Sequence, residues 1–196
     1  MPLSTGQAII INDLDLLFQR SVDVVSLLSS HIKRVTGNND DHSVISAESW
    51  FRTEIMKDFD SRKQHGDIEN WRPSVGKWIL DRNGERKSKT YDLWFQAEEE
   101  VFIELKTFGR GGIERATAIK DLHALTQIRT GNKGWFIALG YPHHEHELER
   151  WDNQINLWLE EYSGKSLLNR NIAFNVNGAE WFMKVFIIEV SGQNQE

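Results

Sequence analysis

The sequence contains no cysteine and only three prolines in 196 residues. Without cysteine it has neither a disulfide framework nor a thiolate zinc site. No apolar run approaches the roughly 20 residues that a membrane-spanning helix needs. The first residues, MPLSTGQAII, lack a basic segment followed by a long apolar one. We therefore expect a protein with no membrane segment and no Sec-type signal peptide, in the reducing environment of the cytoplasm.

Positive charge is also scarce, with 23 Lys and Arg against 29 Asp and Glu and a net charge of −6. This balance argues against a general nucleic-acid coat protein. It does not argue against a nuclease, because metal sites need carboxylates and a local basic patch can still hold a phosphate backbone. The eight tryptophans are either core residues or a stacking surface, and we favour the core.

The chain length suits one domain, 1–196, with a sizeable core. Within it we expect a helical extension over 1–45, a core over 46–140, and a C-terminal helix and strands over 141–196. A strand–helix–strand unit joined to an antiparallel meander predicts an α/β fold, with a central mixed sheet flanked by helices. We expect helices over 12–33, 46–59, 113–129 and 148–162, strands over 75–81, 89–96, 101–108, 134–141, 172–176 and 181–190, and loops over 36–43 and 61–74.

The most informative segment is YDLWFQAEEEVFIELK, residues 91–106, in which three charged residues interrupt two apolar strands. Asp92 lies in the first strand, and Glu104 and Lys106 lie in the second. Side chains alternate between the faces of a strand, and the apolar set should face the core. Asp92, Glu104 and Lys106 should then share the other face, with an odd number of unpaired residues, or a bulge, in the turn. The apolar set on the core face is Tyr91, Leu93 and Phe95 with Val101, Ile103 and Leu105.

Two neighbouring carboxylates repel each other unless something lies between them. Mg²⁺ would remove that repulsion, because it binds one or two carboxylates together with carbonyl groups, water and substrate phosphate. The carbonyl of Leu105, between Glu104 and Lys106, is well placed to help, and Mn²⁺ is an alternative ion. A bound metal makes water more acidic. Lys106 is suited to orient that water, to help deprotonate it, or to neutralise charge on the attacked phosphate.

This arrangement resembles the PD-(D/E)xK nuclease superfamily, which has the restriction-endonuclease-like fold. Asp92 matches the motif aspartate, Glu104 the second acid and Lys106 the lysine, and residues 46–140 supply the family's helix, meander, helix and strand in order. The resemblance implies Mg²⁺-dependent hydrolysis of phosphodiester bonds, in DNA rather than RNA. It does not choose a subfamily, because Tyr91 precedes Asp92 in place of proline and the Gln-x-x-x-Tyr signature is absent.

The resemblance also implies further site residues. The leading helix of the family often carries a metal-directed Glu, for which Glu54 is the best match and Glu48 the second. The helix after the motif offers Lys120 or Gln127 to a substrate phosphate. Many proteins of this fold are dimers, and the strand over 181–190 is a candidate interface for a homodimer.

Three alternatives remain open. Glu104 and Lys106 can be a surface ion pair on a half-exposed strand, as expected for the same spacing at Glu85 and Lys87. The domain can be a non-catalytic module that binds a protein or a nucleic acid, which its acidity and its tryptophans favour. A loop with His143, His144 and His146 can bind Zn²⁺ or Ni²⁺, although we favour a solvated helix start there.

Basic residues near the site have two interpretations. Arg110, in the GRGG segment over 109–112, contacts a phosphate backbone or is a surface arginine without a task. The run RNGERKSK over 82–89 is a hairpin tip that contacts nucleic acid or only water, and we favour the solvated turn.

Overall fold

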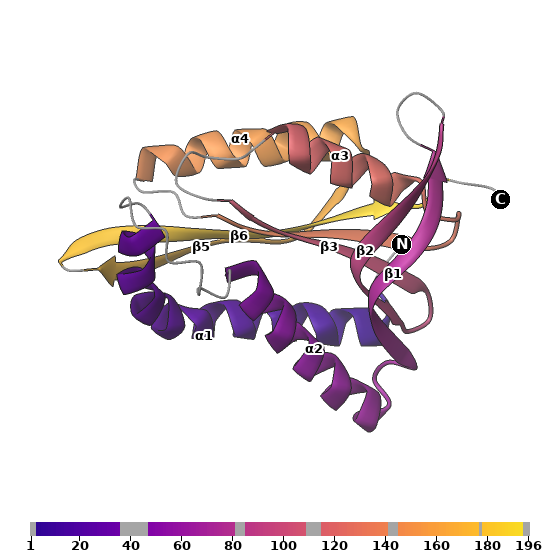
Figure 1. The fold of residues 1–196 in the computed structure, drawn as a ribbon, viewed down its shortest axis with the longest axis horizontal. Coiled ribbons are helices and arrows are strands. Elements are labelled where there is room, and N and C mark those ends of the chain that lie inside the picture. Colours follow the sequence, from indigo (N-terminus) through magenta and orange to yellow (C-terminus); the bar gives the residue numbers. More distant parts are fainter. Residues whose placement is uncertain are drawn as a thin grey trace.

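The computed structural model describes residues 3–35, 47–80, 85–108, 115–140, 145–176 and 178–193. Their elements follow the order expected from the sequence, two helices, three strands, a helix, a strand, a helix and two strands (Figure 1). No helix of these residues is both long and apolar enough to cross a membrane. The elements are α1 (Thr5–Val35), α2 (Ala47–His65), β1 (Asn70–Leu80), β2 (Arg86–Gln96), β3 (Glu100–Phe108), α3 (Arg115–Thr126), β4 (Lys133–Gly140), α4 (Glu145–Glu161), β5 (Lys165–Val176) and β6 (Ala179–Ser191).

The strands form one six-stranded mixed sheet in the order β1-β2-β3-β4-β6-β5. Only β3 and β4, which α3 connects, pair in parallel; the other neighbours are antiparallel. Helices α1 and α2 cover one face of the sheet, and α3 and α4 cover the other (Figure 1). Strand β4 is buried from Gly134 to Gly140, as expected for a strand between two helical layers.

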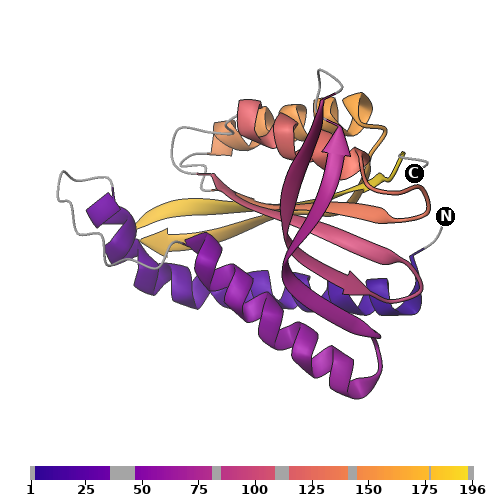
Figure 2. The same cartoon turned by 45° about the vertical axis from the view of Figure 1, so that its right-hand side comes forward.

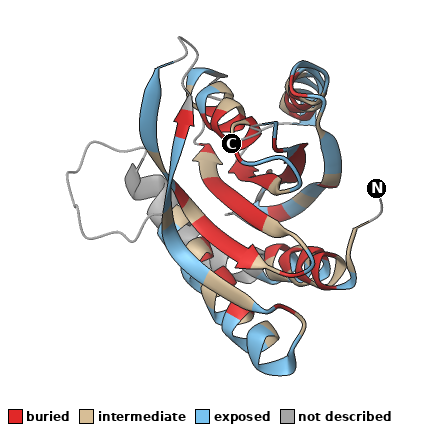
Figure 3. Ribbon diagram, turned by 90° about the vertical axis from the view of Figure 1, so that its right-hand side faces the viewer, coloured by how far each residue is buried: buried red, intermediate tan, exposed pale blue. Residues whose placement is uncertain are grey.

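Each face of the sheet has its own apolar core. The core under α1 and α2 includes Phe18, Phe51 and Phe59 with Leu93 and Phe95. The core under α3 and α4 includes Phe102, Phe136, Trp151, Trp158 and Phe186. Most tryptophans of the described residues serve these cores, as expected, but Trp78 on β1 is 62% exposed. Figure 3 shows the contrast between the buried sheet centre and the exposed length of β1.

Two expected element boundaries are wrong for local reasons. Helix α1 begins at Thr5 rather than residue 12, because Ser4 and Gln7 form a capping box in which each side chain accepts the other's backbone N–H. Residues 61–74 are not a loop: α2 continues to His65, and β1 starts at Asn70. Gly66, the residue after α2, has a φ of 79°, the left-handed conformation that often terminates helices.

The last two strands also differ from expectation. Strand β5 begins at Lys165 instead of 172, because its polar first half pairs with β6 at the edge of the sheet, where polar residues are tolerated. Strand β6 lies between β4 and β5, and its residues 183–190 are buried. The expectation that 181–190 forms a dimer surface is therefore wrong. The hairpin of β1 and β2, at the opposite edge, curls across the end of the sheet (Figure 2).

Candidate active site

Strands β2 and β3 separate next to the predicted site. They pair from Gln96 with Glu100 as far as Leu93 with Ile103, and no further. Three residues, 97–99, join them, which confirms the expected odd turn. The next pair would have been Asp92 with Glu104. We call this point, just beyond Leu93 and Ile103, the strand fork.

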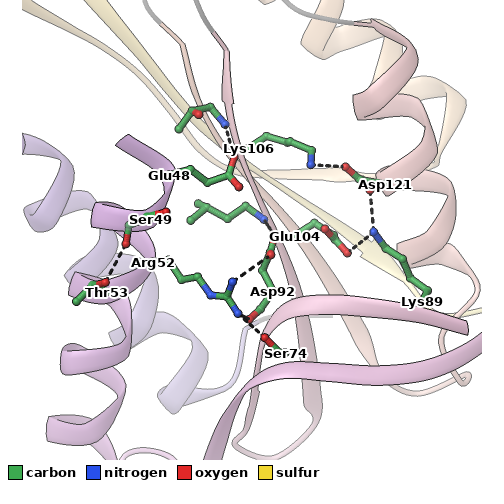
Figure 4. Close-up of polar contacts among 12 residues, drawn as sticks. Glu48, Ser49, Arg52, Thr53, Ser74, Lys89, Asp92, Glu104, Lys106 and Asp121 are labelled. Atoms are coloured by element: carbon green, nitrogen blue, oxygen red, sulfur yellow. Dashed lines mark hydrogen bonds and ion pairs between the residues drawn. The ribbon is translucent and has the colours of Figure 1, made fainter. Parts of the chain in front are cut away.

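Asp92 fills the strand fork with its side chain. Its Oδ2 accepts a hydrogen bond from the Leu105 N–H at 2.9 Å, replacing a bond that a backbone carbonyl of β2 would otherwise accept. The N–H and C=O of a strand residue point to the same side, so the Leu105 carbonyl also faces the fork. Arg52 of α2 holds Asp92 from the other side: its Nη2 donates to the Asp92 carbonyl at 2.9 Å and to Ser74 Oγ at 2.6 Å (Figure 4).

On the α3 side of the fork, four side chains form a chain of alternating charge. Lys89 Nζ lies 2.8 Å from Glu104 Oε1 and 2.9 Å from Asp121 Oδ1. Asp121 Oδ2 lies 3.1 Å from Lys106 Nζ. The two acids are almost inaccessible, with 3% and 5% of their side chains exposed, whereas the lysines keep 21% and 24%. The first alternative, a surface ion pair between Glu104 and Lys106, is therefore wrong: each of them pairs with another residue.

The expected face of Tyr91 is wrong. Its ring packs on Phe102 in the core under α3, and its hydroxyl donates to the Ala124 carbonyl at 2.8 Å. Leu93 and Phe95 lie in the opposite core, as expected. The alternation of β2 slips at Asp92, whose side chain points into the fork rather than onto a face. Opposite this slip, Ser74 of β1 has a φ of 55° and falls outside the ladder.

The fork concentrates acidic groups around few cations. Burial raises the pKa of Glu104 to about 8; Lys89 opposes the rise, while Asp121 and Asp92 add to it. Burial alone would lower the pKa of Lys106, but Asp121, Glu48 and Glu104 outweigh burial and raise it, so Lys106 stays cationic. The charged cluster has four acids and three bases, so a proton on Glu104 or one bound cation would balance its charge. Its members are Glu48, Arg52, Lys89, Asp92, Glu104, Lys106 and Asp121.

Glu48, not Glu54, is the helix acid that belongs to the cluster. Glu48 Oε2 accepts the Thr107 N–H at 3.3 Å, and its pKa is raised by burial and by Asp92, against the attraction of Lys106. Glu54 instead pairs with Lys57 at 2.6 Å. It follows Arg52 by two residues, or about 200° around the helix, so it points away from the fork. The structure thus places Glu48, the second match from the sequence, beside the fork, and Glu54, the preferred match, on another face of the helix.

The structure describes two of the residues expected to contact substrate, Lys120 and Gln127. Lys120 is exposed on α3 beside Asp121. Gln127 follows the last residue of α3 and donates to Thr126 Oγ1 at 3.3 Å. Arg110, His143 and His144 lie outside the described residues. The Glu85–Lys87 pair, 3.6 Å apart and mostly exposed, is the solvated pair expected of it.

Three members of the cluster were not predicted from the sequence. Arg52, Lys89 and Asp121 come from α2, the β1–β2 hairpin and α3, and only the tertiary fold brings them together. Asp121 alone left a signal: it takes a position in the apolar stripe of Ala118, Leu122 and Leu125, where an acid is costly unless it is paired.

The atoms at the fork that could ligate a metal ion are all oxygens. Across the parts of the chain that the structure describes, no group of three or more His, Asp or Glu side chains is arranged to hold a metal ion. Asp92 and Glu104 are two carboxylates, and the Leu105 carbonyl faces the same opening. No protein-family model matches the sequence, and no curated protein matches it.

Proposed function

We propose that the protein is a Mg²⁺-dependent nuclease that hydrolyses phosphodiester bonds in DNA, in the cytoplasm. The observation that carries this proposal is the strand fork, where Asp92 takes the Leu105 N–H beside Glu104. Beyond Leu93 and Ile103 the two strands no longer pair with each other, and Asp92, Glu104 and the Leu105 carbonyl lie at this opening. The resemblance of Asp92, Glu104 and Lys106 to the PD-(D/E)xK motif points to the same chemistry.

The residues of the fork suit a hard divalent cation. Mg²⁺ is typically held by one or two carboxylates and keeps its other positions for water and substrate phosphate, which is the donor set of Asp92, Glu104 and the Leu105 carbonyl. The raised pKa of Glu104 means that its buried carboxylate gains from an added positive charge. When bound, Mg²⁺ or Mn²⁺ would supply an acidified water and a Lewis acid for the phosphate.

Lys106 then acts as the cation that meets the phosphate. Its ammonium stays protonated and is held by Asp121 at 3.1 Å, so its direction is fixed. About a quarter of its side chain is exposed, which leaves it accessible to a ligand. A fixed donor aimed at developing negative charge stabilises the transition state more than a mobile one. Lys89 has the complementary task of holding Glu104.

Cleavage assays with two variants test the proposal. Lys106→Ala and Asp92→Asn should each lower Mg²⁺-dependent cleavage of plasmid DNA by about 100-fold or more, the usual cost of one transition-state contact. Lys165→Ala, an exposed lysine at the far edge of the sheet, is the matched control and should keep full activity. Circular dichroism checks that the variants fold. Full activity in both site variants would sink the proposal.

A second candidate is a non-catalytic module that binds a protein or a nucleic acid. It is favoured by the pairing of Lys89 and Lys106 with Glu104 and Asp121, since these groups neutralise one another without a metal. This module would bind a nucleic acid equally well in Mg²⁺ and in EDTA and would cleave neither DNA nor RNA. The same assays therefore separate the two functions.

A further inference from the structure

The hairpin of β1 and β2 carries an exposed tryptophan beside the fork. Trp78 pairs with Ser88, and on the same face the neighbouring pairs are Gly76 with Thr90 and Leu80 with Arg86. We call the face that carries Trp78, Arg86, Ser88 and Thr90 the outer face of the hairpin. A Cβ added at Gly76 would meet nothing within 4 Å. Gly76, Ser88 and Thr90 are small or polar, and Trp78 is 62% exposed.

Arg86 accompanies the exposed ring. Its guanidinium carbon lies 5.2 Å from the centre of the Trp78 ring, a cation–π distance. Both side chains are exposed. A ring and a guanidinium offer a flat surface and a positive charge at the same place. Such a surface fits a planar ligand that carries negative charge. It fits an apolar protein surface less well, because the described side chains next to Trp78 are polar.

Positive charge is concentrated on these two strands although the chain is acidic. Among the described residues of β1 and β2, five are basic and one, Asp92, is acidic, in a chain of net charge −6. Lys77, opposite Lys89, lies over the Phe102 ring at 5.2 Å. Lys77, Lys87 and Lys89 lie on the face opposite Trp78. On the outer face Arg86 places positive charge beside the exposed ring, and this combination suits single-stranded nucleic acid. The five basic residues are Arg72, Lys77, Arg86, Lys87 and Lys89.

The outer face is continuous with the fork. Strand β2 runs from Ser88, opposite Trp78, to Asp92. Four residues at about 3.3 Å each span roughly 13 Å, the length of about four stacked nucleotides at 3.4 Å. Figure 2 shows the hairpin rising past α3. A strand of nucleic acid on the hairpin would therefore reach the fork within a few nucleotides.

We propose that the outer face of the β1–β2 hairpin is a binding site for single-stranded nucleic acid. An unpaired base stacks on Trp78, and Arg86 contacts the backbone phosphates. Stacking on an open ring requires a base with a free face, which a duplex interior does not offer. The proposal rests on the proposed function for the choice of nucleic acid as ligand, but not on cleavage.

Binding in EDTA tests this site apart from catalysis. The probe is a fluorescein-labelled oligothymidine, and its anisotropy is titrated with the full chain. Trp78→Ala should weaken binding by about 5- to 150-fold, the range for losing one base stack. Trp78→Phe keeps a ring and should retain most of the affinity, while the quenching of tryptophan fluorescence by the probe falls. Leu157→Ala, a residue of α4 that is 52% exposed, is the control and should change nothing.

Each outcome decides between the proposals. Equal affinity of Trp78→Ala and the unchanged protein for the probe would overturn the stacking site. A lack of any binding to the probe would overturn it too, and Trp78 would then be a contact for a protein. Tighter binding of a blunt duplex than of the oligothymidine also overturns it. If binding depends on Trp78 but no metal supports cleavage, the nuclease proposal is wrong and the stacking site is supported. If the protein cleaves DNA but Trp78→Ala does not change binding, the stacking site is wrong and the nuclease proposal is supported.

Discussion

The carboxylate of Asp92 accepts the backbone N–H of Leu105 at 2.9 Å, at the point where β2 and β3 cease to pair. One oxygen of this residue is therefore part of the sheet, while Oδ1 faces Arg52 at 3.8 Å. The same side chain supports the fold and supplies a candidate ligand. Substitutions at Asp92 must separate these two tasks.

Asp92→Asn and Asp92→Ala should differ in stability but not in activity. The amide oxygen of asparagine can still accept the Leu105 N–H, so its loss of unfolding free energy should stay below about 1 kcal/mol, whereas alanine leaves the N–H unpaired and costs about 1–3 kcal/mol. Both remove the ligand charge and should lower Mg²⁺-dependent cleavage by about 100-fold or more. Urea denaturation measures the difference. Equal losses of stability would show that the hydrogen bond to Leu105 contributes little.

The two glutamates of α2 give a matched pair of variants. Glu48→Gln should lower cleavage by about 10- to 100-fold, as for groups that support a site indirectly, because Glu48 acts on Lys106 and holds the Thr107 N–H. Glu54→Gln should keep full activity, since its carboxylate pairs with Lys57 on the far side of the helix. The measurement is the initial rate of DNA cleavage. A larger loss at Glu54 would restore the choice that the sequence favoured.

Metal binding should be visible without any substrate. If Mg²⁺ binds the fork in the folded state alone, a concentration ten times its Kd stabilises by about 1.4 kcal/mol, or a rise in Tm of roughly 3–6 °C for a chain of this size. Glu104→Gln removes one ligand and should lose the shift, and Lys165→Ala should keep it. Thermal melts in EDTA and in Mg²⁺ measure this. No shift in the unchanged protein would argue for the non-catalytic module.

The sequence sufficed for the fold because its signals are local. Helical periodicity and strand alternation gave the element order and the mixed sheet, and the apolar triplets predicted the odd turn between Gln96 and Glu100. The apolar run of β4 predicted a central strand. The signal for the start of α1 is also local, since the capping box is formed by Ser4 and Gln7, three residues apart in the sequence.

The site was harder because its geometry is set by distant residues. Tyr91 changes face because β2 slips opposite Ser74, a residue of another strand. Lys89 and Asp121 meet Glu104 only when the hairpin and α3 come to the same side of the sheet. Alternation within one strand describes neither event. It brought Glu104 and Lys106 to one face correctly, yet it could not show that Asp92 leaves that face to fill the fork.

Lowering the pH should stabilise the packing of α1 on α2. Burial and the neighbouring Asp13 raise the pKa of Asp58 from 3.8 to about 6. The folded state thus binds this proton more tightly than the unfolded state, and the contribution of Asp58 to stability falls as pH rises from about 4 to about 6. Asp58→Asn should remove this dependence and should stabilise more at about pH 7 than at about pH 4. Urea melts at both pH values check it, and an equal effect at both would contradict the raised pKa.

The contact between Gly140 of β4 and Trp151 of α4 leaves no space for a side chain at position 140, so a substitution there tests how tightly α4 packs on β4. A Cβ at Gly140 would lie 1.6 Å from Trp151 Cη2, and Trp151 is itself packed against Phe108 and Phe186. Gly140→Ala must therefore displace a buried indole. The expected loss is about 3 kcal/mol, which corresponds to a fall in Tm of roughly 6–12 °C.

Gly76→Ala is the control, because its Cβ would meet open space on the hairpin. Alanine is favoured over glycine within a strand by roughly 0.5–1 kcal/mol, so this variant should be as stable as the unchanged protein or slightly more so. Thermal melts of the two variants measure the contrast. A similar Tm for both would mean that Trp151 can move aside, and that α4 is held against β4 by its other residues, Ile155 and Trp158 among them.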